Sequence, residues 1–236
     1  IKSPLFDYPI ISTNLKYLKY IKKILRNKGI TKYRIVLEPA KKNTAPAILT
    51  SALIKEIPYE QPLVFLSSDH LIEKKEKFND EIKKHKKFLN NINIFIFGIK
   101  PNSISDQFGY FITKKVHSLN QVSRFIEKPN LSKAQKIIKK GGYWNSGIFF
   151  LRKDSLINNF IKFQNKIYKN SLLAVNRSKY KNNIYYLNKK AFIKNPSKSF
   201  DYAILEKTKK INAIKLNIKW SDLGSWKEIL LMFKKN

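Results

Sequence analysis

Residues 33–53 read YRIVLEPAKKNTAPAILTSAL, and the character of the sequence changes in the middle of this stretch. Residues 33–37 are a short run of mainly β-branched, aromatic and apolar side chains, which is typical of a buried strand. Thr44 is a candidate N-cap for a helix, and Pro46 suits the first turn of that helix, where its missing N–H group is not needed. The stretch therefore predicts a strand followed directly by a helix.

The rest of the chain repeats this alternation. Residues 15–25 carry apolar side chains at helical spacing, and Gly29 stands where that helix would end. Further strands are expected at 63–66, 92–99, 110–114, 116–119, 122–126, 148–151, 211–216 and 218–220. Further helices are expected at 78–89, from Ser132 to Gly141, at 155–163, at 200–206 and from Trp226. With no internal repeat or long linker, the pattern predicts one α/β domain over residues 1–236, with a mixed sheet flanked by helices.

The composition limits the chemistry that the chain can carry. With 236 residues and 43% hydrophobic content, it is long enough to bury one substantial core. It has no cysteine and three scattered histidines, which excludes thiolate nucleophiles and cysteine zinc sites, so any metal is expected on oxygen ligands. The sequence has no apolar run of membrane-spanning length and no recognisable secretion signal, so a cytoplasmic protein is expected.

The formal net charge of +32 suggests an anionic partner such as a nucleic acid, a nucleotide or a membrane surface. The chain is also rich in Lys, Ile and Asn, whose codons are rich in A and T, so genomic base composition alone accounts for much of the lysine content. The lysines are spread along the whole chain rather than gathered in one stripe. We therefore expect no nucleic-acid or membrane partner, and a basic nucleic-acid-binding domain stays as a competing hypothesis.

Asp69, Glu127 and Asp222 each stand just beyond an expected strand, in a chain with only 16 acidic residues. Ligands of open α/β sheets bind beyond the carboxyl ends of the strands, so these acids are expected at one edge of the sheet. Each acid taken alone is better explained as the cap of a following turn. Together they favour a site in which two carboxylates hold Mg²⁺, a cation that prefers oxygen ligands and shares its shell with substrate phosphates.

Six short segments resemble, in order, the motifs of the mannose-1-phosphate guanylyltransferase family. They are EPAKKNTAPAI at 38–48, SSDH at 67–70, FIEKP at 125–129, WNSG at 144–147, FDYAILEK at 200–207 and WSDLGSW at 220–226. A single tetrapeptide would be weak evidence, whereas six matches in the family's order make a strong one.

The resemblance implies a Rossmann-like (GT-A-like) nucleotidyltransferase fold. It also implies transfer of a guanylyl group from GTP to mannose 1-phosphate, which gives GDP-mannose and pyrophosphate and serves polysaccharide biosynthesis. The sugar phosphate would attack the α-phosphorus directly, so catalysis would rest on positioning and charge neutralisation. This is why the family needs no Ser-His or Cys-His pair. A homo-oligomer is compatible with this assignment.

The resemblance also implies roles for individual residues. Asp69 and Asp222 would bind Mg²⁺, and Lys128 would place its ammonium group near the sugar phosphate, so these three would form the catalytic set. The sugar side would be formed by Gly109, Glu127, Lys128, Asn145 and Gly147. The nucleotide side would include Asn43 and Thr44 at the start of a helix. The tryptophans are expected to serve core packing.

The sequence departs from the family pattern in two places. The family shows a segment similar to TGYGYI, whereas residues 106–111 read DQFGYF and keep only the second glycine, Gly109. Residues 1–37 contain nothing similar to the GGxGxRLWPLS loop, so we expect the fold to lack the first strand and this loop, and turnover to be impaired. No C-terminal β-helix or isomerase domain is expected. The alternative is a non-catalytic remnant that binds sugar phosphate, or a regulatory partner.

Overall fold

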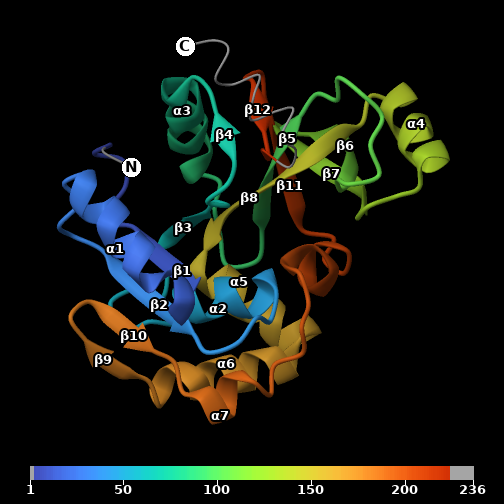
Figure 1. Ribbon diagram of the computed structural model, residues 1–236. Coiled ribbons are helices and arrows are strands. Elements are labelled where there is room, and N and C mark those ends of the chain that lie inside the picture. The colour runs from blue at the N-terminus through green and yellow to red at the C-terminus, as the bar shows by residue number, and fades with distance from the viewer. Residues whose placement is uncertain (1–2, 224–236) are drawn as a thin grey trace. The chain divides into compact units, whose positions relative to one another are not determined.

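The computed structural model describes residues 3–223, so the helix expected from Trp226 lies outside the described residues. The chain divides into two compact units (Figure 1). The first unit comprises Ile1–Gln61 and Leu156–Lys207, and the second comprises Pro62–Ser155 and Thr208–Asn236. The expectation of a single domain over residues 1–236 stays a prediction. Within residues 3–223, no helix has the length and apolar character needed to span a membrane.

The first unit contains a four-stranded sheet in the order β1-β2-β10-β9. Its strands are β1 (Ile10–Asn14), β2 (Arg34–Glu38), β9 (Lys179–Lys181) and β10 (Ile184–Tyr186). Its helices are α1 (Leu18–Asn27), preceded by a 3₁₀ turn at Leu15–Tyr17, α2 (Thr44–Ala52), α6 (Asn165–Asn176), α7 (Lys189–Phe192) and a π-helical turn, η2 (Asp201–Leu205). Strands β1, β2 and β10 are parallel, which is the arrangement that helical crossovers produce.

One buried cluster joins α1 to this sheet. Leu25 from α1 packs with Ile35 and Leu37 of β2 and Ile184 of β10, and each of these four side chains is at most 5% exposed. Gly29 has a φ of +61°, a left-handed conformation that ends the helical segment without a steric penalty. Helix α1 and the strand at β2 therefore form where the apolar pattern predicts them.

The second unit contains a six-stranded mixed sheet in the order β3-β8-β5-β11-β7-β6. Its strands are β3 (Pro62–Phe65), β5 (Ile94–Ile99), β6 (Tyr110–Val116), β7 (Leu119–Ile126), β8 (Tyr143–Arg152) and β11 (Ile211–Leu216). Strands β5 and β11 are parallel, and the other pairs are antiparallel. Strand β6 also pairs with the start of β8, through Tyr110 with Trp144 and Phe111 with Tyr143. This second pairing brings the entrance of β6 beside β8.

Two further strands form a separate ribbon in the second unit. These are β4 (Leu71–Ile72) and β12 (Trp220–Ser221), which pair antiparallel. Helices α3 (Lys75–Lys86) and α4 (Leu131–Lys139) also belong to this unit, and α5 (Lys153–Phe163) begins in it. The mixed α/β architecture expected from the sequence is confirmed.

Three local expectations differ from the structure. Helix α2 is capped by Asn43, whose side chain accepts from the Thr44 N–H at 2.8 Å, and not by Thr44. Helix α4 is likewise capped by Asn130, and not by Ser132. Asparagine competes well as a cap because its short amide oxygen reaches the first backbone N–H groups. The expected strands at 110–114 and 116–119 are parts of one hairpin, because the chain continues as a strand to Val116 before it turns.

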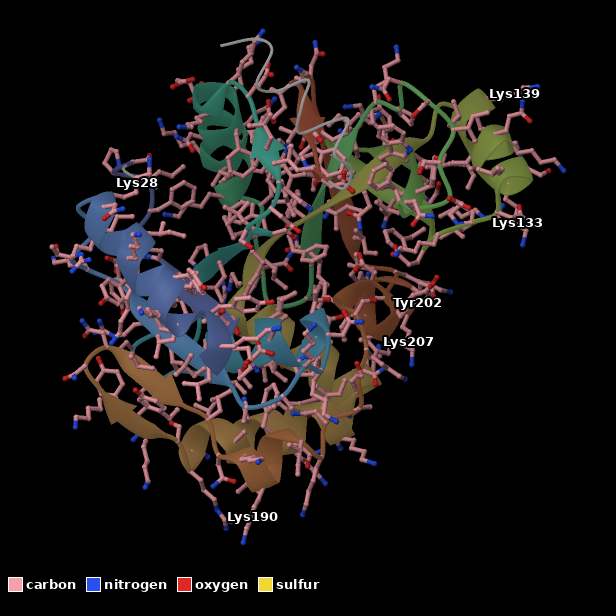
Figure 2. All side chains as sticks on the ribbon, in the orientation of Figure 1. Lys28, Lys133, Lys139, Lys190, Tyr202 and Lys207 are labelled. Atoms are coloured by element: carbon pink, nitrogen blue, oxygen red, sulfur yellow. The ribbon has the colours of Figure 1, made fainter. Side chains whose placement is uncertain are left out.

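The lysines cover helix exteriors in both units, as the sequence predicts. Figure 2 shows Lys133 and Lys139 projecting outward from α4, and Lys190 projecting outward from α7, and all three side chains are exposed. Within residues 3–223, exposed basic side chains lie on several separate elements.

Candidate functional site

The pairing of β4 with β12 brings Asp69 and Asp222 to the same end of one two-stranded ribbon. Ser221 pairs with Leu71 in antiparallel register. Asp222 follows Ser221, and Asp69 precedes Leu71 by two residues, so both acids extend from the ribbon in the same direction. Two residues that are far apart in the sequence therefore lie close together because of a pairing of only two residues in each strand.

His70 lies beside Asp69, and both Asp69 and Asp222 act on it electrostatically. Its Nε2 atom is 3.9 Å from Oδ1 of Asp69, and its ring stands edge-on to Trp220 with the centroids 5.2 Å apart. Burial lowers the pKa of His70, and the negative charges of Asp69 and Asp222 act in the opposite direction. The side chain of His70 is 13% exposed and that of Asp69 is 76% exposed. The imidazole is therefore held inside the site while the Asp69 carboxylate faces solvent.

The donor set at this end of the ribbon fits a hard divalent cation. Carboxylate oxygens are the ligands that Mg²⁺ prefers, and Mg²⁺ is commonly held by one or two carboxylates together with substrate phosphates and water. Among residues 3–223, no cluster of three or more His, Cys, Asp or Glu side chains is placed to hold a metal. A pair of carboxylates that shares the cation with a phosphate agrees with this geometry better than a cage made only of protein.

A second group of predicted residues meets where β6, β7 and β8 come together. The Asn145 N–H donates to the carbonyl oxygen of Gly109 at 2.8 Å. A Cβ atom on Gly109 would overlap Oε2 of Glu127 and would lie 3.3 Å from the ring of Phe125. Gly109 therefore leaves room for the Glu127 carboxylate, which would have to shift if a methyl group were added.

Gly147 links this group to the two acids. It has a φ of +70°, and a Cβ atom there would stand 3.5 Å from Cε1 of His70. The Asn145 side-chain oxygen accepts from the Gly147 N–H at 3.4 Å. Lys128, which follows Glu127, is exposed and has a left-handed φ of 45°. All seven predicted residues of the second unit thus belong to connected segments: Asp69, Gly109, Glu127, Lys128, Asn145, Gly147 and Asp222.

The predicted nucleotide residues lie in the first unit, after the end of β2. Asn43 adopts a left-handed φ of 64° and caps α2. The Thr44 hydroxyl accepts from the Phe200 N–H at 2.8 Å, and the Ala45 N–H donates to the Lys198 carbonyl at 3.1 Å. The first N–H groups of α2 are thus engaged within the protein. Contacts from this turn to a nucleotide would have to come mainly from side chains.

Glu38 is a further acid at a strand end, and it is not among the acids that the sequence pattern assigned to the site. It ends β2 directly opposite Asn14, which ends the parallel strand β1. Ser12 Oγ donates to Oε1 of Glu38 at 2.6 Å, and Asn14 Nδ2 donates to the Glu38 carbonyl at 3.0 Å. Burial raises the pKa of Glu38, and the hydrogen bond from Ser12 opposes this shift. The signal was present in the sequence, because Glu38 follows an expected strand as the other three acids do.

The sequence is similar to a known protein family and to curated proteins of that kind. Residues 5–236 match the family described as "Nucleotidyl transferase". The chain is 32% identical over 225 residues to the mannose-1-phosphate guanylyltransferase of Klebsiella pneumoniae, covering 92% of this chain and 48% of that protein. It is 34% identical over 224 residues to the xanthan biosynthesis protein XanB of Xanthomonas campestris pv. campestris (strain B100), covering 94% and 48%. The chain thus spans about half the length of the curated relatives it matches.

Solved structures with a similar fold also match the chain. The crystal structure of mannose-6-phosphate isomerase from Helicobacter pylori matches with a TM-score of 0.82 and 31% identity, covering 92% of this chain and 85% of that one. A structure described as mannose-1-phosphate geranyltransferase from Thermus thermophilus matches with a TM-score of 0.79 over 96% of this chain and 64% of that one. Its identity is 19%, so it supports the fold alone.

Proposed function

The chain belongs to the nucleotidyl transferase family, and from this premise we propose that it takes part in the transfer of a guanylyl group from GTP to mannose 1-phosphate, with release of GDP-mannose and pyrophosphate. The observation that supports the proposal is the pairing of Ser221 with Leu71, which brings the segments of Asp222 and Asp69 to the same end of the β4–β12 ribbon. Two carboxylates at one end of a ribbon suit a cation that is shared with the phosphates of both reactants.

Asp69 and Asp222 would hold Mg²⁺ together with the phosphates of GTP and mannose 1-phosphate. When bound there, Mg²⁺ supplies neutralisation of the negative charge that the two substrates bring together. Lys128 would add its ammonium group as a point charge near the sugar phosphate, since its side chain is exposed next to Glu127. The protein itself would contribute position and charge rather than a covalent intermediate.

The sugar would lie against Glu127, Asn145 and Gly147. A carboxylate accepts hydrogen bonds from sugar hydroxyls, and an amide both donates and accepts, so the first two can read several hydroxyl groups. Support for this role comes from the room that Gly109 leaves, where a larger residue would displace the Glu127 carboxylate. Gly147 would allow the backbone to approach the ligand closely.

Glu38 would give the nucleotide side its preference for guanine. A carboxylate can accept from two donors in parallel, and the guanine edge offers the N1–H and the exocyclic N2 amino group. Support for this role comes from the position of Glu38 at the carboxyl end of a parallel strand, a few residues before Asn43 and Thr44. Asn43 and Thr44 would then contact the nucleotide with their side chains.

The proposal also includes a cytoplasmic location and a role in making nucleotide sugars for polysaccharides. A homo-oligomer is compatible with it. Nucleic-acid binding is the competing explanation of the +32 charge, and strong, salt-dependent retention on DNA would favour it.

Calorimetric titration of the 236-residue chain with mannose 1-phosphate, in Mg²⁺ and in EDTA, tests the proposal. We expect binding that is stronger in Mg²⁺, and we expect Asp222→Asn to weaken it about tenfold, which corresponds to about 1.4 kcal/mol. Asp80→Asn is the matched control, because Asp80 is 71% exposed on α3 and pairs with Lys83 on the surface. The proposal is contradicted if Mg²⁺ does not strengthen binding, or if Asp222→Asn and Asp80→Asn weaken binding equally. Pyrophosphate release from GTP then separates an enzyme from a non-catalytic binding protein.

A further inference from the structure

A chain of four aromatic rings crosses the second unit. Phe108 lies 4.8 Å from Trp144 and 5.5 Å from Trp220, measured between ring centroids. Trp220 in turn lies 5.2 Å from His70. The rings come from β8, from the segment before β6, from β12 and from the residue before β4. The ring of Phe108 thus contacts both tryptophans.

The two tryptophans stand next to the residues of the site. Trp144 precedes Asn145 on β8, and Trp220 precedes Ser221 and Asp222 at β12. A contact that holds Trp220 against Trp144 through Phe108 therefore also sets the distance between the acids and the sugar-binding residues. Both tryptophans are held within the protein, since Trp144 is 5% exposed and Trp220 is half-buried.

In the part of the chain that the structure describes, no strand pairing links the β4–β12 ribbon to β8, so backbone hydrogen bonds between strands do not fix the distance between them. Strands β4 and β12 pair with each other and form their own two-stranded sheet, whereas β8 belongs to the six-stranded sheet. A short two-stranded ribbon is marginal by itself and needs packing against a larger element. The aromatic contacts, together with the approach of Gly147 to His70, supply packing of this kind.

We infer that Phe108 is a positioning residue that packs the β4–β12 ribbon against β8 and thereby fixes Asp69 and Asp222 relative to Asn145 and Gly147. The ring lies tilted against Trp144 at 50° and close to edge-on against Trp220 at 66°, geometries that aromatic pairs favour. What the site binds rests on the proposed function, whereas the packing role of Phe108 does not.

The first test measures the ribbon itself, without any ligand. Hydrogen exchange is followed in peptides that cover residues 70–73 and 219–223, where Glu73 N–H donates to the Lys219 carbonyl at 3.1 Å. We expect Phe108→Ala to speed exchange there about tenfold, with β5 and β8 unchanged, because local opening depends on the packing that holds an element in place. Phe108→Tyr, which keeps the ring, restores slow exchange. Unchanged exchange in Phe108→Ala, or an equal increase throughout the second unit, overturns the inference.

Phe88→Ala is the matched control. Phe88 is also half-buried in the second unit, but its ring contacts His85 and not the ribbon. The Phe88→Ala substitution removes the same type of ring from a half-buried position, so it measures how much hydrogen exchange changes when any such phenylalanine is lost. We expect Phe88→Ala to leave exchange in the ribbon as in the unaltered protein. Faster exchange of the ribbon in this control would show that the response is not specific to Phe108 and would contradict the inference.

The second test measures binding of mannose 1-phosphate to the same variants, with Mg²⁺ and with EDTA. If Phe108 positions the acids, Phe108→Ala should bind mannose 1-phosphate about tenfold more weakly than the unaltered protein in Mg²⁺. In EDTA the two proteins should bind it nearly equally. Phe108→Tyr retains the gain. Loss of affinity to the same extent in both conditions contradicts positioning of the acids. If the unaltered chain does not bind mannose 1-phosphate, the proposed function fails, and the exchange result still decides the role of Phe108.

Discussion

The imidazole of His70 stands edge-on to the indole of Trp220, at an interplanar angle of 87°. The contact joins the segment that enters β4 to the strand β12, and the pairing of Leu71 with Ser221 continues from it. Nδ1 of His70 is buried and has no hydrogen-bond partner within the part of the chain that the structure describes. The ring is therefore held by packing and by its acidic neighbours, which makes it sensitive to protonation.

We expect His70→Leu to make the stability of the protein less sensitive to acid. Burial lowers the pKa of His70 below its unfolded value of 6.5. The stability that neutral His70 contributes is then fully present above that value, and it is lost as the pH falls toward the folded-state pKa. Urea denaturation at about pH 7.5 and about pH 5.5 should show a larger loss for the unaltered protein than for His70→Leu. Replacing the exposed His117 by Asn should leave the loss unchanged, and equal losses in all three proteins would refute the expectation.

Gly109→Ala should destabilise the protein by about 1 kcal/mol, the lower end of the range for overpacking, because the end of the Glu127 side chain can shift. The added methyl group would overlap Oε2 of Glu127, so the cost should shrink when Glu127 is also replaced by Ala. Denaturation of both single variants and of the double variant gives the interaction energy directly. If Gly109→Ala costs the same in both backgrounds, the glycine is not present to make room for Glu127.

The sequence offers candidate residues for the site, but it does not predict how they meet. Asp69 and Asp222 can be picked out in the sequence as acids that follow expected strands. The pairing that brings them together, between β4 and β12, involves only two residues in each strand, which is too short to show a periodic pattern. Phe108 carries no sequence signal for its contacts, because these depend on two tryptophans that are distant in the chain. Patterns of local origin are therefore predicted, whereas contacts that depend on the tertiary fold are not.

Local competition explains the errors in the helices. Asn43 and Asn130 take the cap positions expected for Thr44 and Ser132, because either residue type can cap and sequence alone does not rank them. Helix α6 is not predicted, although its buried residues Ile167, Ser171 and Ala174 recur at helical spacing. The mixture of polar and charged residues between these positions weakens the pattern.

Replacing Glu38 by Gln should raise the stability of the folded protein at neutral pH and should change that stability little in acid. Burial raises the pKa of Glu38 above its usual 4.5, against the hydrogen bond from Ser12. A raised folded-state pKa means that the associated stability is complete below about 4.5 and is lost as the pH rises through the folded-state pKa. Glutamine does not ionise, so its advantage should grow with pH in thermal denaturation. The exposed Glu60→Gln serves as control, and a destabilising effect of Glu38→Gln at neutral pH would contradict the argument.

Thr44→Val should lower stability by about 0.5–1.5 kcal/mol, because it removes the hydroxyl that accepts from the Phe200 N–H. The Phe200 N–H donates to the Thr44 hydroxyl at 2.8 Å, and the Phe200 side chain is fully buried. Thr44→Ser keeps the hydroxyl and should be close to neutral, so the difference between the two variants in urea denaturation isolates this hydrogen bond.

The same pair of variants separates the two tasks assigned to Thr44. If the hydroxyl contacts a nucleotide as well as Phe200, Thr44→Val weakens nucleotide binding beyond what its loss of stability explains, whereas Thr44→Ser preserves both. If only stability falls, the hydroxyl serves the fold alone, and nucleotide contact at this turn rests on Asn43. The oxygen of Asn43 already accepts from the Thr44 N–H, so its amide group would have to provide that contact as a donor.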